Sequence, residues 1–161
     1  MSYMKLIKLL YLADREALVR WGRTITTDTY VSMKHGPVLS QVLDLITEGP
    51  NPVAGDTFWT RHISEPEHYE VSLKSDPSND LLSEAEDEVL DEIFRQYGRM
   101  SRWQLVDLVH KLPEWKDPNG GAFPIQIADI LRAQNRPPED IRAIEEDIKA
   151  LDQVDCFLTA R

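Results

Sequence analysis

The stretch KLIKLLYLADREAL, residues 5–18, predicts the helix on which the rest of the fold depends. At 100° per residue, apolar side chains gather on one side of this helix and most charged side chains gather on the other. The apolar set is Ile7, Leu10, Tyr11, Ala17, Leu18 and Trp21. We therefore expect an amphipathic helix over Tyr3–Trp21 that ends at Gly22.

Asp14 projects from the centre of the apolar side of this helix. A buried carboxylate is costly unless it accepts hydrogen bonds or pairs with a cation. The candidate donors are the imidazoles of His35 and His110 and the hydroxyl of Tyr30. We expect Asp14 to tie the first helix to the segment around Tyr30–Gly36. A contact between Asp14 and a histidine would also fit a general base with its orienting carboxylate.

The composition is that of an ordinary folded protein. The chain has 161 residues, of which 42% are hydrophobic and 29% charged, so it suits one domain with a sizeable core. No apolar run approaches the roughly 18 residues that a membrane span needs. Charges interrupt the apolar pattern at the start of the chain, so we expect no secretion signal. The single cysteine, Cys156, cannot form an internal disulfide, which fits a cytoplasmic location.

The net charge of −10 is unevenly distributed along the chain. Residues 1–74 carry eight basic and nine acidic side chains, whereas residues 75–161 carry ten basic and nineteen acidic ones. The segment 75–92 contains eight carboxylates and no cation. Nucleic-acid binding relies on clustered Lys and Arg, so a nucleic-acid partner is not favoured. The acidic segment suits a basic protein partner, or else it is a solvated helix start.

The remaining pattern predicts a mainly α (α+β) fold, a single helical domain of about six helices with a small antiparallel β-hairpin. An extended piece is expected at Tyr30–Met33, and Pro37 is expected in the first turn of a helix that ends at Gly49. Alternating residues predict a hairpin between segments 57–63 and 68–74. Capping boxes predict helices from Ser83 and Ser101. A loop is expected over 113–124 and helices over 125–135 and 137–158. The C-terminal helices, 125–158, should pack on the rest of one domain spanning 1–161.

Sequence signatures of catalytic and metal sites are missing. The four histidines show no His-x-x-x-His spacing and the lone cysteine has no partner, so no zinc site is expected. There is no Gly-rich phosphate loop and no Gly-x-Ser-x-Gly elbow. We expect no cofactor. A hydrolase built on Asp14, His35 and His110 stays as an alternative, and it requires these side chains to converge in an open pocket.

The motifs KLLYLADREAL (residues 8–18), MKHGPV (33–38) and LVDLVHKLPEW (105–115) occur in this order along the chain. Together they resemble the Panacea, or SocA-like, antitoxin domain family, over roughly residues 4–118. The hallmarks of that family match Tyr11, Ala13, Asp14, Gly36, Pro37, His110 and Trp115, and Tyr30 and His35 lie close to the same motifs. Relatives often carry a longer leader, so we expect the first turn of the first helix to be incomplete.

The resemblance implies a non-enzymatic protein, the antitoxin half of a bacterial or phage toxin–antitoxin pair. Such a domain neutralises a cognate protein toxin, encoded by an adjacent gene, by binding it directly. Some relatives look like adaptors that present the toxin to an ATP-dependent protease. The family is paired with many unrelated toxins, so the resemblance does not name the toxin. The motif residues are expected to be scaffold or shared interface.

Two sets of residues are candidates for toxin binding. Leu9, Leu12 and Val19 fall on the charged side of the first helix, so the helix is either buried all round or has a docking surface there. The acidic candidates are Glu84, Asp87 and Glu88. A DNA-binding autoregulator remains an alternative. It would need a basic recognition helix, and the segment 101–111 offers only Arg102 and Lys111 as cations.

Overall fold

The computed structural model describes residues 1–49, 57–78 and 80–159, with seven helices and one three-stranded sheet among them. Their order is α1 (Tyr3–Trp21), β1 (Tyr30–Met33), β2 (Gly36–Leu39), α2 (Ser40–Thr47), α3 (Phe58–His62), α4 (Glu84–Tyr97), α5 (Arg102–Val109), β3 (Phe123–Ile125), α6 (Ile127–Ala133) and α7 (Pro138–Thr159). The expected mainly α fold with a small β-hairpin is confirmed, and so are the bounds of α1.

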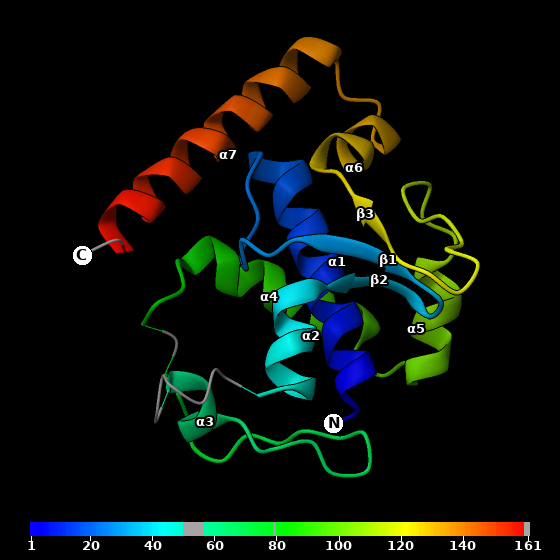
Figure 1. Ribbon diagram of the computed structural model, residues 1–161, viewed down its shortest axis with the longest axis vertical. Helices are drawn as coiled ribbons and strands as arrows, with labels where there is room; N and C mark the ends of the chain where they lie inside the picture. Colours follow the sequence, from blue (N-terminus) through cyan, green and yellow to red (C-terminus); the bar gives the residue numbers. More distant parts are fainter. Residues whose placement is uncertain (50–56, 79, 160–161) are drawn as a thin grey trace.

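α1 is the central helix of the fold (Figure 1). It contacts α2, α4, α5, α6 and β2, and apolar side chains are buried on opposite sides of it. Ile7, Tyr11 and Leu18 join the core formed with the sheet, α6 and α7. Leu9 and Leu12 join a second core with α4 and α5. Burial on both sides explains why apolar residues also occur on the nominally charged side of the helix.

The sheet has the strand order β2-β1-β3 and is antiparallel throughout. Tyr30 of β1 pairs with Leu39 on one side and with Ile125 on the other. The prediction that Pro37 lies in the first turn of a helix is wrong, because residues 36–39 form β2 and α2 begins at Ser40. All four residues of β2 are buried, so tertiary packing outweighs the local helix-start signal of Gly-Pro.

The two strands predicted at segments 57–63 and 68–74 do not form, and the segments pair only at one end, through an antiparallel bridge between Ile63 and Leu73. Residues 58–62 form the short helix α3, whose capping box joins Thr57 and Thr60. The second segment has only isolated bridges, and Tyr69 has a positive φ of 65° that a regular strand does not allow. Tyr69 is 69% exposed and only Val71 is buried among the alternating apolar residues. The hairpin of this fold is instead β1–β2.

The helices predicted from capping boxes are confirmed. The side chain of Glu86 accepts from the backbone N–H of Ser83 at 2.8 Å, and that of Gln104 accepts from the N–H of Ser101 at 2.8 Å. These reciprocal bonds satisfy backbone donors that a helix start leaves unpaired. α4 and α5 therefore begin where their sequences predict.

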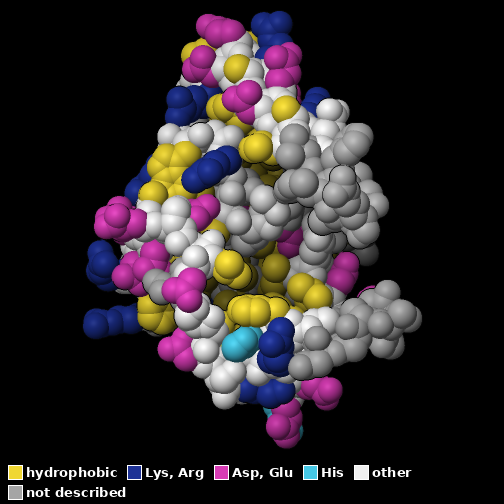
Figure 2. All heavy atoms as spheres, turned by 90° about the vertical axis from the view of Figure 1, so that its left-hand side faces the viewer, with side chains coloured by type: hydrophobic (Ala, Val, Ile, Leu, Met, Phe, Trp, Pro, Cys, Tyr) yellow, Lys and Arg dark blue, Asp and Glu magenta, His cyan; other side chains and the backbone are white. Residues whose placement is uncertain are grey.

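The C-terminal part adds to both the sheet and the core. β3 lies in a segment that was predicted to be loop and helix start, and it pairs with β1. Side chains of this part in the first core are Ile125, Ala128, Ile130, Leu131 and Ile141. α7 then runs away from the sheet as the long orange-red helix of Figure 1. Seen from the left of that view, hydrophobic side chains gather in the middle of the face, and charges of both signs surround them (Figure 2).

Candidate functional site

Asp14 lies on α1, and its carboxylate is fully buried and accepts four hydrogen bonds. Its Oδ1 atom accepts from the backbone N–H groups of Ile25 (2.8 Å) and Thr26 (2.9 Å). Its Oδ2 atom accepts from the hydroxyl of Thr26 and from that of Tyr30, the latter at 3.0 Å. Burial raises the pKa of Asp14, although these hydrogen bonds oppose the shift. The expected link to Tyr30 is confirmed, and the loop after α1 supplies the other donors.

A second buried carboxylate, that of Glu114, lies against α1. Its Oε1 atom accepts from the hydroxyl of Tyr11 at 3.1 Å and from Nε of Arg15 at 2.6 Å. The rings of Tyr11 and Tyr30 meet edge to face at 5.5 Å, so the two carboxylate sites adjoin. Burial is the main cause that raises the pKa of each tyrosine, and the charge of the neighbouring carboxylate is the second. Both hydroxyls therefore stay protonated and remain hydrogen-bond donors. No sequence pattern indicates the role of Glu114.

Asp28 caps the start of α2 although it lies in the loop before β1, far from α2 along the chain. No sequence pattern indicates this role. The Oδ1 atom of Asp28 accepts from the N–H of Gln41 and its Oδ2 atom from the N–H of Val42, both at 2.9 Å. The residue at the usual cap position, Leu39, has no side-chain oxygen to accept these bonds. The loop between α1 and β1 therefore fixes the start of α2.

Lys8 is buried although its position on α1 predicts a charged surface. Its Nζ atom donates to the carbonyl oxygen of Pro37 at 2.6 Å. Gly36 lies beside this contact and has a φ of +98°, which suits glycine; a Cβ there would lie 2.5 Å from Cγ2 of Val109 and 3.3 Å from Nζ of Lys8, so glycine lets both side chains pack against this turn. Burial lowers the pKa of Lys8 to about 7.

His110 and Trp115 stack on each other, with ring centroids 4.0 Å apart. The indole Nε1 of Trp115 donates to the carbonyl oxygen of Met33 at 3.2 Å. Burial, and then the charge of Lys8, lower the pKa of His110, and its Nε2 atom has no hydrogen-bond partner among the described residues. The imidazole of His35 instead meets the ring of Trp103 edge to face at 5.7 Å. These contacts hold α5 and the following segment against the β1–β2 hairpin.

The sequence profile described as "Antitoxin SocA-like, Panacea domain" matches residues 6–116, more than half of the chain. The chain belongs to this family. The matched range runs from α1 through α5 and includes all the motif residues whose contacts are described above. No curated protein and no solved structure matches the chain. Membership in the Panacea family supports an antitoxin role in general, with a toxin as partner, and suggests a non-enzymatic protein.

The side chains named for a hydrolase do not form one site in this Panacea domain. The carboxylate of Asp14 accepts hydrogen bonds from the loop after α1 and from Tyr30. Neither His35 nor His110 is among its described hydrogen-bond partners. His110 stacks on Trp115, and His35 meets Trp103. An enclosed carboxylate with four donors has no free lone pair directed at a substrate. The described hydrogen bonds of Asp14 all go to groups of the fold itself.

Two of the three apolar candidates for toxin binding are not on the surface. Leu9 and Leu12 are each only 7% exposed and pack with Val89, Ile93 and Leu105 of α4 and α5. The interpretation of α1 as a helix buried all round therefore fits the structure, and a docking surface at these two residues does not. Val19 is half-buried, and its carbonyl oxygen accepts from the guanidinium of Arg136.

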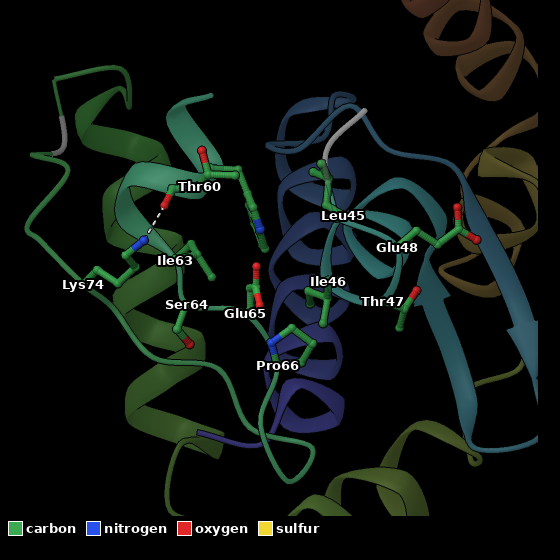
Figure 3. Close-up of a pocket in the computed structure, with 12 residues that line it drawn as sticks. Leu45, Ile46, Thr47, Glu48, Thr60, Ile63, Ser64, Glu65, Pro66 and Lys74 are labelled. Atoms are coloured by element: carbon green, nitrogen blue, oxygen red, sulfur yellow. Dashed lines mark hydrogen bonds between the residues drawn. The ribbon is translucent and has the colours of Figure 1, made fainter. Parts of the chain in front are cut away.

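A hollow of about 370 Å³ lies between the end of α2 and the segment from α3 to Pro66 (Figure 3). Its ionisable lining residues are Glu48, Glu65 and Lys74, and Nζ of Lys74 donates to the carbonyl oxygen of Thr60 at 2.7 Å. No histidine or cysteine is among the described residues that line it.

The described residues contain neither a cluster of metal-binding side chains nor a helix fit to span a membrane. They hold no group of three or more His, Cys, Asp or Glu side chains placed to bind a metal ion. In the same part of the chain, no helix combines the length and the apolar character that crossing a membrane requires.

Proposed function

We propose that this protein is the antitoxin of a toxin–antitoxin pair and neutralises its toxin by direct protein–protein binding in the cytoplasm. The toxin would be the product of an adjacent gene. The proposal treats residues 1–161 as one Panacea-like domain. The observation that carries it is the family match over residues 6–116. It is supported by the enclosed carboxylates of Asp14 and Glu114, which accept hydrogen bonds from groups of the protein itself.

The acidic face of α4 is proposed as an electrostatic attraction for a basic toxin. The residues concerned are Glu84, Asp87 and Glu88, and the side chains of Glu84 and Glu88 are exposed. Two other carboxylates of this helix lie near cations of α1 or of the segment after it: Glu92 lies 2.6 Å from Arg20 of α1, and Glu86 lies 4.0 Å from Arg23. Clustered charge of one sign raises the rate at which an oppositely charged partner binds.

The test is a growth assay combined with a binding measurement. The adjacent gene is expressed from an inducible promoter, alone and together with this chain, and the two purified proteins are mixed for size-exclusion chromatography with light scattering. We expect growth arrest that this chain relieves and a complex of fixed stoichiometry. Arrest that persists, or relief without a complex, contradicts neutralisation by direct binding.

A pair of charge variants tests the acidic face. Glu84→Lys combined with Glu88→Lys reverses two charges on α4, and Glu139→Lys combined with Glu146→Lys reverses two exposed charges on α7. We expect the α4 variant to slow association at low salt and the α7 variant to leave it unchanged, because only the first alters the proposed contact face. Equal association rates for the two variants contradict a role for α4.

A role as a protease adaptor is a finer proposal that the same strains can test. If the chain presents the toxin to an ATP-dependent protease, the toxin should disappear after synthesis is stopped, and only when this chain is present. A toxin that accumulates as a stable complex contradicts the adaptor role but not neutralisation.

A DNA-binding autoregulator has little support, since Arg102 is the only cation on α5 and the chain carries a net charge of −10.

A further inference from the structure

Two apolar hollows adjoin where the first turn of α1 meets the β1–β2 turn and the start of α5, in the lower right of Figure 1. Their volumes are about 220 Å³ and 210 Å³, and Tyr3 and Met4 line both of them. We call this pair of hollows the aromatic groove. Its defining residues are Tyr3, Met4, Met33, His35, Tyr69 and Trp103.

The groove exposes large side chains that the fold holds in place. Trp103 is 50% exposed although it contacts the ring of His35, and Tyr69 is exposed although its ring lies 6.1 Å from that of Tyr3. Met33, at the end of β1, is 36% exposed. Trp, Tyr and Met are enriched at the centres of protein–protein interfaces, and side chains that are already ordered lose little entropy on binding.

The charges around the groove are positive, in contrast to the chain as a whole. No Asp or Glu is among the described residues that line either hollow, although the chain has 28 acidic and 18 basic side chains. Lys34 lines one hollow and Arg102 the other, and the guanidinium of Arg102 lies 5.4 Å from the ring centroid of Trp103. The nearby carboxylates of Glu67 and Glu70 line a separate hollow.

We propose that the aromatic groove is the docking site for an amphipathic segment of the toxin, in which apolar side chains are flanked by carboxylates. The apolar side chains would fill the two hollows on either side of Tyr3 and Met4, and the carboxylates would meet Lys34 and Arg102. This proposal rests on the antitoxin function proposed above. It adds a second contact, of opposite charge, to the acidic face of α4.

Two variants of the full chain test the aromatic side chain and the positive charges of the groove separately. Trp103→Ala removes the exposed aromatic wall, and Lys34→Glu combined with Arg102→Glu reverses the charge. Each has a matched control: Phe58→Ala removes an aromatic side chain that is 51% exposed on α3, and Arg142→Glu combined with Lys149→Glu reverses two exposed cations on α7. The circular dichroism spectrum and melting temperature of every variant show that it is folded.

The first probe is the purified product of the adjacent gene, and the measurement is the dissociation constant by calorimetry. We expect each groove variant to bind at least about 30-fold more weakly, as at an interface hot spot, and the controls to bind within about threefold of wild type. If Trp103→Ala does not fold, the charge variant alone carries the test. Groove variants that bind like wild type overturn the groove proposal and leave the antitoxin proposal standing. A wild-type chain that does not bind contradicts the antitoxin function itself.

The second probe is a set of overlapping peptides that cover the sequence of the same toxin. We expect binding by a peptide that carries apolar residues flanked by Asp or Glu, with affinity that falls as salt rises and is lost in the charge variant. Binding confined to Lys- and Arg-rich peptides would overturn the proposal. Aromatic and Arg side chains also stack on bases, so a single-stranded DNA oligonucleotide is included. Tighter binding of that oligonucleotide than of any peptide would overturn it as well.

Discussion

The hydroxyl of Tyr30 donates a 3.0 Å hydrogen bond to the carboxylate of Asp14 and thereby joins the first strand of the sheet to the central helix. The same ring packs edge to face on Tyr11, whose hydroxyl donates to Glu114. Two buried carboxylates are thus tied to one pair of tyrosines. In this Panacea domain, the network holds the β1–β2 hairpin against α1.

Removing the carboxylate of Asp14 should destabilise the protein strongly. Asp14→Ala leaves the N–H groups of Ile25 and Thr26 and two hydroxyls without their acceptor, so we expect a loss of about 3–5 kcal/mol in the free energy of unfolding. Tyr30→Phe removes one donor and should cost about 2 kcal/mol. Urea unfolding followed by circular dichroism measures both. Asp44→Ala, at an exposed carboxylate, is the control, and an equal stability of Asp14→Ala and this control would contradict the prediction.

Gly36 should tolerate no side chain. Its φ is +98°, and a Cβ would lie 2.5 Å from Cγ2 of Val109, so Gly36→Ala combines backbone strain with overpacking and should cost about 2–4 kcal/mol. Gly120→Ala is the matched control, because its φ is +91° and no atom lies within 4 Å of its Cβ. We expect that control to cost about 1–2 kcal/mol. Adding Val109→Ala should then lower the cost of Gly36→Ala, and strictly additive effects would rule out the clash.

Asp28 should stabilise α2 as a helix cap does. Asp28→Ala removes the acceptor for the N–H groups of Gln41 and Val42, and we expect a loss of about 1–2 kcal/mol. Asp28→Asn keeps one acceptor oxygen and should lose less. Amide hydrogen exchange should show the loss of protection in α2 first. Unchanged exchange there, together with an unchanged melting temperature, would mean that the cap is unimportant.

The sequence predicted the polar link of Asp14 but not most of its donors. The position of Asp14 on an apolar face implied a buried carboxylate, and Tyr30 was among the candidate donors. The N–H groups of Ile25 and Thr26 could not be identified, because every residue carries a backbone donor and the path of a loop is not encoded in periodicity. Glu114 and Asp28 were missed for a related reason, since their partners lie far from them along the chain.

The misplaced strands show where local pattern fails. Gly-Pro usually precedes a helix, but the residues from Gly36 to Leu39 are buried between α1 and β1, and that burial favours a strand. The alternation in segment 68–74 predicts a half-buried strand, but Tyr69 and Leu73 are 69% and 60% exposed. α4 and α5 were predicted correctly because capping boxes are local and specific.

The stability of the protein should depend on pH through Lys8. Burial lowers the pKa of Lys8 from 10.5 to about 7, so between pH 7 and 10 the unfolded chain holds a proton on Lys8 that the folded protein has lost. Stability from this group therefore rises with pH, by about 2 kcal/mol between pH 7 and 9, and is lowest below pH 7. His110 does not contribute in this window, because its pKa is lowered from 6.5.

Lys8→Met keeps the length of the side chain and removes the titration. Urea unfolding of the wild type and of Lys8→Met at pH 7, 8 and 9 gives the difference in the free energy of unfolding at each pH, and groups common to both proteins cancel. We expect this difference to shift in favour of the wild type by about 2 kcal/mol across the series. The carbonyl of Pro37 loses its donor in the variant at every pH, which moves the difference by a constant amount and leaves its slope unchanged. Parallel stability curves would show that Lys8 is charged in the folded protein throughout, and that the network around it accommodates an ammonium ion.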